Sequence, residues 1–393
     1  MKNNSTSPSK KRVLPIIILS QFCCTSTWFA GNSIIEDLIT AYNLSTQSLG
    51  NISSAVQFGF ILGTLLFAFF TVSDRFSPSK IFFSCAIVGA IFNLGMLYSN
   101  NTIGTLLVFR FFTGFSLAGI YPVGMKIASD HYKKGLGLSL SFLVGALVLG
   151  TSFPYLIKSF NINLNWAFVV WSTSLLSLLG GLLIIVFVGS GPYQELAPRF
   201  DASKIINVFN KSSFRAAAFG YFGHMWELYA FWTFTPILLI AYSKLHNVDI
   251  NIPLMTFIII ASGTFACILG GYIATKFGTK NTAVSALGLS GLCCLLSPLL
   301  FSINSSVLFI IILIVWGMAV IADSPLFSTM VTQNSDAHSR GTALTIVNCI
   351  GFTITIISIQ LLNLFLAQFE NPQFIFMILA LGPIIGLVYL RKS

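Results

Sequence analysis

The chain of 393 residues is 55% apolar and only 8% charged, with 38 Phe and 11 Tyr. A soluble globule of this length needs far more charge on its surface, so water is not its main solvent. The net charge of +10 does not indicate a nucleic-acid partner, because the basic residues are spread over alternate loops and form no continuous stripe.

Apolar windows of about 20 residues, enough to cross roughly 30 Å of hydrocarbon, recur along the whole chain. Their continuous apolar character predicts helices, because barrel strands would be shorter and would alternate polar with apolar residues. The fold class is therefore an all-α membrane protein of twelve transmembrane helices. We place the spans at 13–35, 48–72, 80–98, 104–127, 137–158, 166–188, 214–241, 252–274, 281–302, 306–329, 343–366 and 372–390.

The basic residues predict the topology. All but three of the 21 Lys and Arg residues lie in segments that an even number of spans places on one side, together with the N-terminus. The exceptions are Arg110, which lies within a span, and Lys158 and Lys244. By the positive-inside rule, both termini are expected in the cytoplasm. The first span resembles a signal peptide after its basic start, but it is too long and lacks a cleavage site, so we expect it to be retained.

The longest polar interval, residues 189–213, separates six spans from six. We therefore expect an N-terminal six-helix bundle at 1–188, a cytoplasmic linker at 189–213 and a C-terminal six-helix bundle at 214–393, around a central cavity.

The same short motif follows span four and span ten: an acidic residue, three other residues, a basic residue and a glycine. Its recurrence indicates a parallel internal repeat. We interpret these charges as a gate of salt bridges and helix caps that holds one access state. The predicted gate residues are Asp74, Arg75, Asp130, Lys134, Asp336 and Arg340.

The loop after span two resembles the signature of the major facilitator superfamily, Gly-x-x-x-Asp-Arg/Lys-x-Gly-x-Arg-Lys, with Asp74, Arg75 and Lys80 near their places. Arg110 and Gly114 in span four are similar to the family's Arg-x-x-Gln-Gly element. The resemblance covers nearly the whole chain and implies two bundles that rock about a central cavity, but it does not name a substrate. Span five lacks the Gly-Pro-x-x-Gly-Gly element that is typical of the family's drug-proton antiporters.

Ionisable side chains are costly inside a span, so each indicates a function. His224 and Glu227 are three residues apart on span seven and share a helix face, with Tyr221 one step further along. We hypothesise that Glu227 is a proton-coupling site and His224 its modulator, with Tyr221 in contact with the substrate. The alternative is that His224 and Glu227 form hydrogen bonds across the interface between the bundles.

Three more charged residues lie in predicted spans. Arg110 offers a fork of donors suited to an oxyanion, and it is a candidate for substrate contact. Alternatively, Arg110 interacts with the proton-coupling site, or it packs against neighbouring backbone carbonyls. Asp323 is either a second acidic site in contact with the substrate or an ion partner for Arg110. Lys126 lies near a span end, where it can snorkel to the interface.

Trp28 and Asn32 belong to a semi-polar stripe on span one that also includes Gln21 and Thr25. Such a stripe predicts a wet cavity in which Trp28 stacks on a solute and Asn32 forms a hydrogen bond with it. The alternative is hydrogen bonding between helices.

These features predict a secondary transporter in a lipid bilayer that moves a small organic anion or polar metabolite together with protons, its substrate cavity being formed by spans one, four, seven and ten. No phosphate-cradling loop, metal-ligand spacing or catalytic constellation is visible, so we expect no cofactor, no metal and no enzyme activity. Two alternatives remain: an exporter of amphipathic compounds such as a drug or siderophore, and a non-transporting sensor. We expect a monomer in a bacterial inner membrane.

Overall fold

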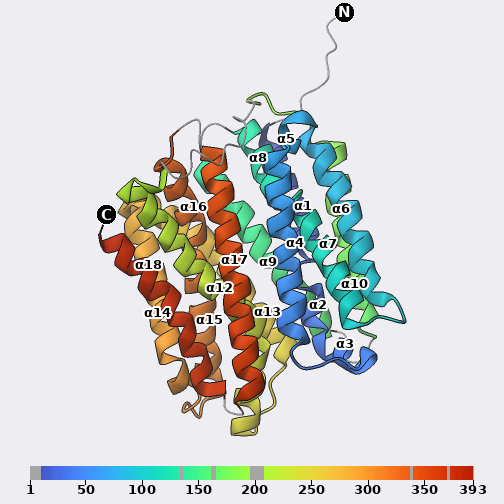
Figure 1. The fold of residues 1–393 in the computed structure, drawn as a ribbon, viewed down its shortest axis with the longest axis vertical. Coiled ribbons are helices and arrows are strands. Elements are labelled where there is room, and N and C mark those ends of the chain that lie inside the picture. Colours follow the sequence, from blue (N-terminus) through green and yellow to red (C-terminus); the bar gives the residue numbers. More distant parts are fainter. Residues whose placement is uncertain are drawn as a thin grey trace, which may run out of the picture.

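In hydrocarbon the backbone must satisfy its own hydrogen bonds, which is why the apolar runs of this chain fold as helices. The computed structural model describes residues 10–132, 136–160, 165–194, 208–336, 340–369 and 372–392, and these residues form helices and no strand (Figure 1). Within them, 11 helices are long and apolar enough to cross a membrane, and a shorter apolar helix, Arg12–Thr25, begins the first span. The predicted all-α fold with twelve spans is confirmed.

The first six spans form one bundle. Its helices are α1 (Lys10–Thr25), α2 (Ala30–Ser33), α3 (Ile35–Tyr42), α4 (Ser48–Phe69), α5 (Val72–Arg75), α6 (Pro78–Leu94) with the 3-10 turn η1 (Gly95–Leu97), α7 (Ile103–Leu117), α8 (Tyr121–His131), α9 (Leu136–Phe160) and α10 (Ala167–Phe187).

The last six spans form the second bundle. Its helices are α12 (Ser212–His246), α13 (Ile252–Phe277), α14 (Thr279–Leu300), α15 (Ser306–Ala322), α16 (Ser324–Gln333), α17 (Arg340–Gln368), the 3-10 segment η2 (Pro372–Ala380) and α18 (Leu381–Arg391). We call the end of the molecule from which α1 starts the terminal face, and the opposite end the far face.

Span one is broken where its sequence is rich in Ser and Thr. The hydroxyls of Thr25, Ser26 and Thr27 donate to the carbonyls of Gln21, Cys23 and Cys24 at 2.8, 2.7 and 2.9 Å. Such bonds compete with the helical ladder, and here α1 ends at Thr25 while α2 begins only at Ala30.

Spans four and ten are also interrupted, at residues 118–120 and at Asp323, where the sequence predicted continuous helices. In both spans a proline stands in the first turn of the second segment, Pro122 in α8 and Pro325 in α16. A proline lacks the amide proton that would continue the preceding helix, but it suits the start of a new one. Each interrupted span still crosses as one segment, Ile103–His131 for span four and Ser306–Gln333 for span ten.

The two bundles meet along α4 with α17 and along α9 with α13, and the first of these pairs lies at the front of the view in Figure 1. Hydrogen bonds cross both contacts. Gln360 Nε2 on α17 donates to Ser54 Oγ and to the carbonyl of Gly50 on α4, at 2.9 and 3.2 Å. Thr264 Oγ1 on α13 donates to the carbonyl of Gly145 on α9 at 3.1 Å.

Candidate functional site

A buried acid–base pair joins spans seven and ten. His224 Nδ1 on α12 lies 2.8 Å from Asp323 Oδ1, and the two side chains are 1% and 0% exposed. Asp323 occupies the interruption between α15 and α16, where its carbonyl accepts the amides of Leu326 and Phe327. The interruption in span ten thus places the carboxylate next to the imidazole of span seven. Sequence reasoning named both residues but did not pair them.

Glu227 lies one turn along α12 and has different partners. Its Oε1 accepts a hydrogen bond from Trp316 Nε1 at 2.7 Å, and its Oε2 accepts one from Ser290 Oγ at 2.9 Å. The side chain is fully buried. Both carboxylate oxygens are therefore held by neutral donors from α14 and α15, within the second bundle. His224 and Glu227 do not share a partner.

A small cavity lies between the bundles next to the His224–Asp323 pair. We call it the central cavity; its volume is about 40 Å³, room for only a few water molecules. It is lined by Tyr121, Met125, Val144, Leu147, Tyr221, Met225, Leu228, Tyr229, Ile321, Ser324, Ser328, Leu344, Asn348 and Phe352. Ser324 directly follows Asp323, and the ring of Tyr221 lies 5.9 Å from that of His224. The pair therefore sits directly behind the cavity wall.

Arg110 on α7 is fully buried and holds the broken part of span one. Its Nη2 donates to the carbonyls of Thr27, at 2.9 Å, and Trp28, and its Nη1 donates to Asn93 Oδ1 at 3.1 Å. The break in span one frees carbonyl groups, and a guanidinium with several donors can satisfy them. This geometry matches the predicted packing of Arg110 against neighbouring carbonyls.

An aromatic layer separates the central cavity from the far half of the interface. It consists of Trp28, Phe60, Tyr229 and Phe352, which come from both bundles. The ring of Trp28 lies 5.1 Å from Phe60, 5.6 Å from Tyr229 and 6.0 Å from Phe352. Trp232, one turn beyond Tyr229 on α12, stacks edge-on against it at 5.3 Å. The layer closes the space between the bundles.

Several neutral polar groups around this layer are buried without a hydrogen-bond partner among the described residues. They are Asn32 Oδ1, both amide atoms of Gln57, and the indole nitrogens of Trp28 and Trp232. The Asn32 amide nitrogen donates to Ser53 Oγ at 2.7 Å. Gln57 stands one turn from Ser53 on α4, so it lies on the same side of that helix. Sequence reasoning missed Gln57; an isolated amide in the middle of an apolar span was the signal.

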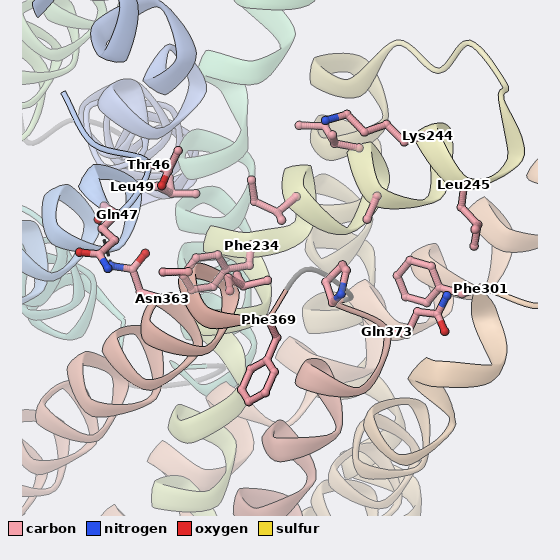
Figure 2. A pocket seen from close by; sticks show the side chains of 16 residues that line it. Thr46, Gln47, Leu49, Phe234, Lys244, Leu245, Phe301, Asn363, Phe369 and Gln373 are labelled. Carbon is pink, nitrogen blue, oxygen red and sulfur yellow. Dashed lines mark hydrogen bonds between the residues drawn. The ribbon is translucent and has the colours of Figure 1, made fainter. Parts of the chain in front are cut away.

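A larger pocket opens toward the far face, between α4, α12 and α17 (Figure 2). This far-face pocket has a volume of about 720 Å³, and its lining includes Phe234, Lys244 and Asn363. Figure 2 shows Asn363 joined to Gln47 by a hydrogen bond from its side-chain amide to the backbone carbonyl, 3.0 Å long. Together with Gln360, Asn363 forms an amide clasp between the bundles.

The predicted gate residues lie at the terminal face. Lys126 Nζ lies 3.0 Å from Asp74 Oδ1 and 4.0 Å from Asp130 Oδ1, so these three form one charge cluster within the first bundle. Lys126 is thus an ion partner as well as a residue near a span end. Arg75 lines the surface pocket beside this cluster.

The second set of predicted gate residues is only partly described. Asp336 Oδ1 lies 2.6 Å from Lys211 Nζ. Arg340 is the exposed first residue of α17. Lys134 lies outside the described residues. The structure therefore shows an ion pair of Asp336 with Lys211, which the sequence had not suggested.

Twelve helical spans in two bundles, with a small cavity between them, define a polytopic membrane protein of the transporter type. The sequence model of the Major Facilitator Superfamily matches residues 17–359, and the chain belongs to this superfamily.

Known proteins agree with this assignment. The MFS-type transporter acdC of Aspergillus candidus is 29% identical over 150 residues, a match that spans 37% of this chain and 29% of that relative. The solved proton:xylose symporter XylE has a TM-score of 0.75 at 15% identity, over 98% of this chain and 95% of that one. The nucleoside transporter NupG has a TM-score of 0.71 at 14% identity, over 98% of both chains. At these identities the structural likeness shows the shared fold.

Proposed function

We propose that this protein is a proton-coupled secondary transporter of a small polar solute and that the His224–Asp323 pair is its protonation site. The observation that carries the proposal is the position of this pair. It is buried, it joins two spans that face the central cavity, and one member sits in a helix break. A proton that reaches the cavity could neutralise Asp323 and loosen its contact with His224. The two halves of span ten would then be free to move relative to span seven.

Burial makes such a pair sensitive to protonation. Two buried groups of opposite charge stabilise each other, whereas one left alone is strongly destabilised. Loss of one charge therefore favours a conformation in which the other is solvated. Glu227 differs, because the indole of Trp316 and the hydroxyl of Ser290 hold its carboxylate and no Lys, Arg or His lies at ion-pair distance from it among the described residues. The contacts favour Asp323 over Glu227 as the primary site, and Glu227 stands as a second candidate.

The two cavities support an alternating-access path. Tyr229 lines the central cavity and Phe234 lines the far-face pocket, and both lie on α12. The aromatic layer stands between these spaces. We propose that they are the two ends of one path, that the layer and the amide clasp close its far end, and that the charge cluster of Asp74, Lys126 and Asp130 controls the terminal end.

The remaining expectations complete the proposal. The linker at 189–213 divides the bundles 1–188 and 214–393, both termini are cytoplasmic, and the protein works as a monomer in a bacterial inner membrane. The distribution of basic residues supports this orientation.

The proposal is tested by infrared difference spectroscopy of the purified protein, which detects a protonated carboxyl group without a known substrate. Lowering the pH should produce a carboxylic-acid band that Asp323→Asn removes. Asp249→Asn is a matched control, because Asp249 is exposed near the far end of α12. A band that survives Asp323→Asn and disappears in Glu227→Gln would transfer the site to Glu227. If neither variant alters the spectrum, the proposal is wrong.

A further inference from the structure

The buried groups between the bundles identify the chemical class of the solute. We infer that this transporter binds an uncharged, hydrogen-bonding solute with a ring face, and that Gln57 is a specificity-determining residue. The inference rests on the proposed function for the existence of a solute, and it narrows the small organic anion or polar metabolite that the sequence suggested to an uncharged compound.

The first step is that the central cavity offers a solute no charged side chain among the described residues, whereas Lys244 lines the far-face pocket at the other end of the path. The lining of the central cavity contains no Lys, Arg, Asp or Glu. Both Nη groups of Arg110 are engaged by the carbonyls of Thr27 and Trp28 and by Asn93, whereas its Nε has no hydrogen-bond partner among the described residues. The carboxylate of Asp323 faces the imidazole of His224, with 2.8 Å between Oδ1 and Nδ1. A desolvated anion or cation in this space would lack a countercharge, and that costs several kcal/mol.

The second step is the set of unpaired neutral groups. Gln57 offers an amide donor and an acceptor, Asn32 offers an acceptor, and Trp28 and Trp232 each offer an indole donor. All four residues are at most 1% exposed. Buried polar atoms without partners are rare because each costs about 1–3 kcal/mol. A solute with hydroxyl or amide groups would satisfy both the donors and the acceptors of this set.

The third step is the direction of Gln57. Successive residues of a helix point 100° apart. On α4, Ser53 faces Asn32 of span one, and Ser54 faces Gln360 of α17. Gln57 projects between these two directions and therefore toward the space between span one and α17. Phe60, on the next turn, contacts both Trp28 and Phe352. The amide thus stands beside the aromatic layer.

The fourth step concerns the ring face. The central cavity is too small for a solute in this conformation, so the bundles must separate for binding. Separation would expose the faces of Tyr229 and Phe352, which now stack on Trp28, and the face of Trp28 itself. A solute ring can replace these contacts, and the hydrogen-bonding groups at the edge of the layer can then bind its substituents.

The inference is tested by thermal-shift measurements on the purified full-length protein at constant pH, with no proton gradient. The neutral probes are D-xylose, D-glucose, uridine and adenosine, the anionic probes are succinate and citrate, and the cationic probe is tetraphenylphosphonium. At least one neutral probe should stabilise the protein, because a ligand that binds only the folded state stabilises it by mass action. The charged probes should not stabilise it.

Gln57→Leu should raise the Kd of that neutral probe at least about tenfold, because a partner group of the solute loses its hydrogen bond. Trp232→Phe keeps an aromatic face and removes the indole donor together with part of the ring, so a rise in Kd for this variant supports the inference even where Gln57→Leu fails to fold. Gln368→Leu changes an exposed amide at the end of α17 and should leave the Kd unchanged.

Two results would overturn the inference: stabilisation by an anion or cation and by none of the neutral probes, and neutral binding that neither Gln57→Leu nor Trp232→Phe weakens. Stabilisation by no probe at all counts against it equally. Because binding is measured at equilibrium without a gradient, its outcome is independent of whether His224 and Asp323 couple transport to protons.

Discussion

Replacing Arg110 separates its two proposed roles. Arg110→Met keeps an apolar stem but removes hydrogen bonds to two backbone carbonyls and to Asn93. Each charge-assisted bond contributes about 1.5–3 kcal/mol, and part of this is offset because the variant no longer buries a charge. We therefore expect a loss of about 2–4 kcal/mol in the free energy of unfolding. Arg110→Lys should fall between this variant and the natural protein, because an ammonium group lacks the fork that reaches several acceptors.

The assay is equilibrium unfolding in mixed micelles of detergent and dodecyl sulfate, followed by tryptophan fluorescence. Arg75→Met serves as the control, because Arg75 is exposed and should change stability by less than about 0.5 kcal/mol. If Arg110→Met unfolds like the natural protein but loses binding of succinate or citrate, then Arg110 contacts an anionic substrate. That result would refute its structural role.

Three further predictions concern the contacts between helices. Gly114→Ala should cost about 1–3 kcal/mol in a thermal-unfolding comparison with Gly341→Ala, because the new methyl would meet the Val56 carbonyl on α4 whereas Gly341 has open space around it; equal stabilities would contradict the close packing of α4 and α7. Gln360→Ala should loosen the amide clasp by about 1 kcal/mol, which shifts the ratio of open to closed states about fivefold, and spin labels on α4 and α17 should report a longer distance at the far face; an unchanged distance distribution would speak against the clasp. Lys126→Met leaves two carboxylates of the terminal cluster without their cation, and it should lower the turnover of a transported solute by about tenfold with little change in KM; a change confined to KM would make the cluster part of a binding site.

The spans could be predicted from the sequence because membrane thickness imposes a minimum length on each apolar run. The breaks in spans four and ten could not be predicted from the sequence, although Pro122 and Pro325 lie next to them. A proline inside a membrane helix is compatible with a kink as well as with a restart, and the neighbouring helices decide between the two.

The functional residues were partly visible in the sequence. The sequence singled out His224, Glu227 and Asp323, because ionisable side chains are rare in the hydrocarbon core. It did not give their partners: His224 and Asp323 are far apart in the chain, and only the arrangement of spans seven and ten brings them together. Gln57 was missed because burying a neutral amide in a membrane span costs little free energy, and such amides commonly form hydrogen bonds between helices.

The central claim is that protons accompany an uncharged solute, so that transport moves net charge. Current recordings on proteoliposomes adsorbed to a solid-supported membrane measure this directly. A neutral probe that binds should evoke a current that grows with an inward proton gradient in the natural protein and disappears in Asp323→Asn, while exchange of labelled solute continues. Equal solute uptake without any current, or a current that Asp323→Asn leaves intact, would contradict the mechanism.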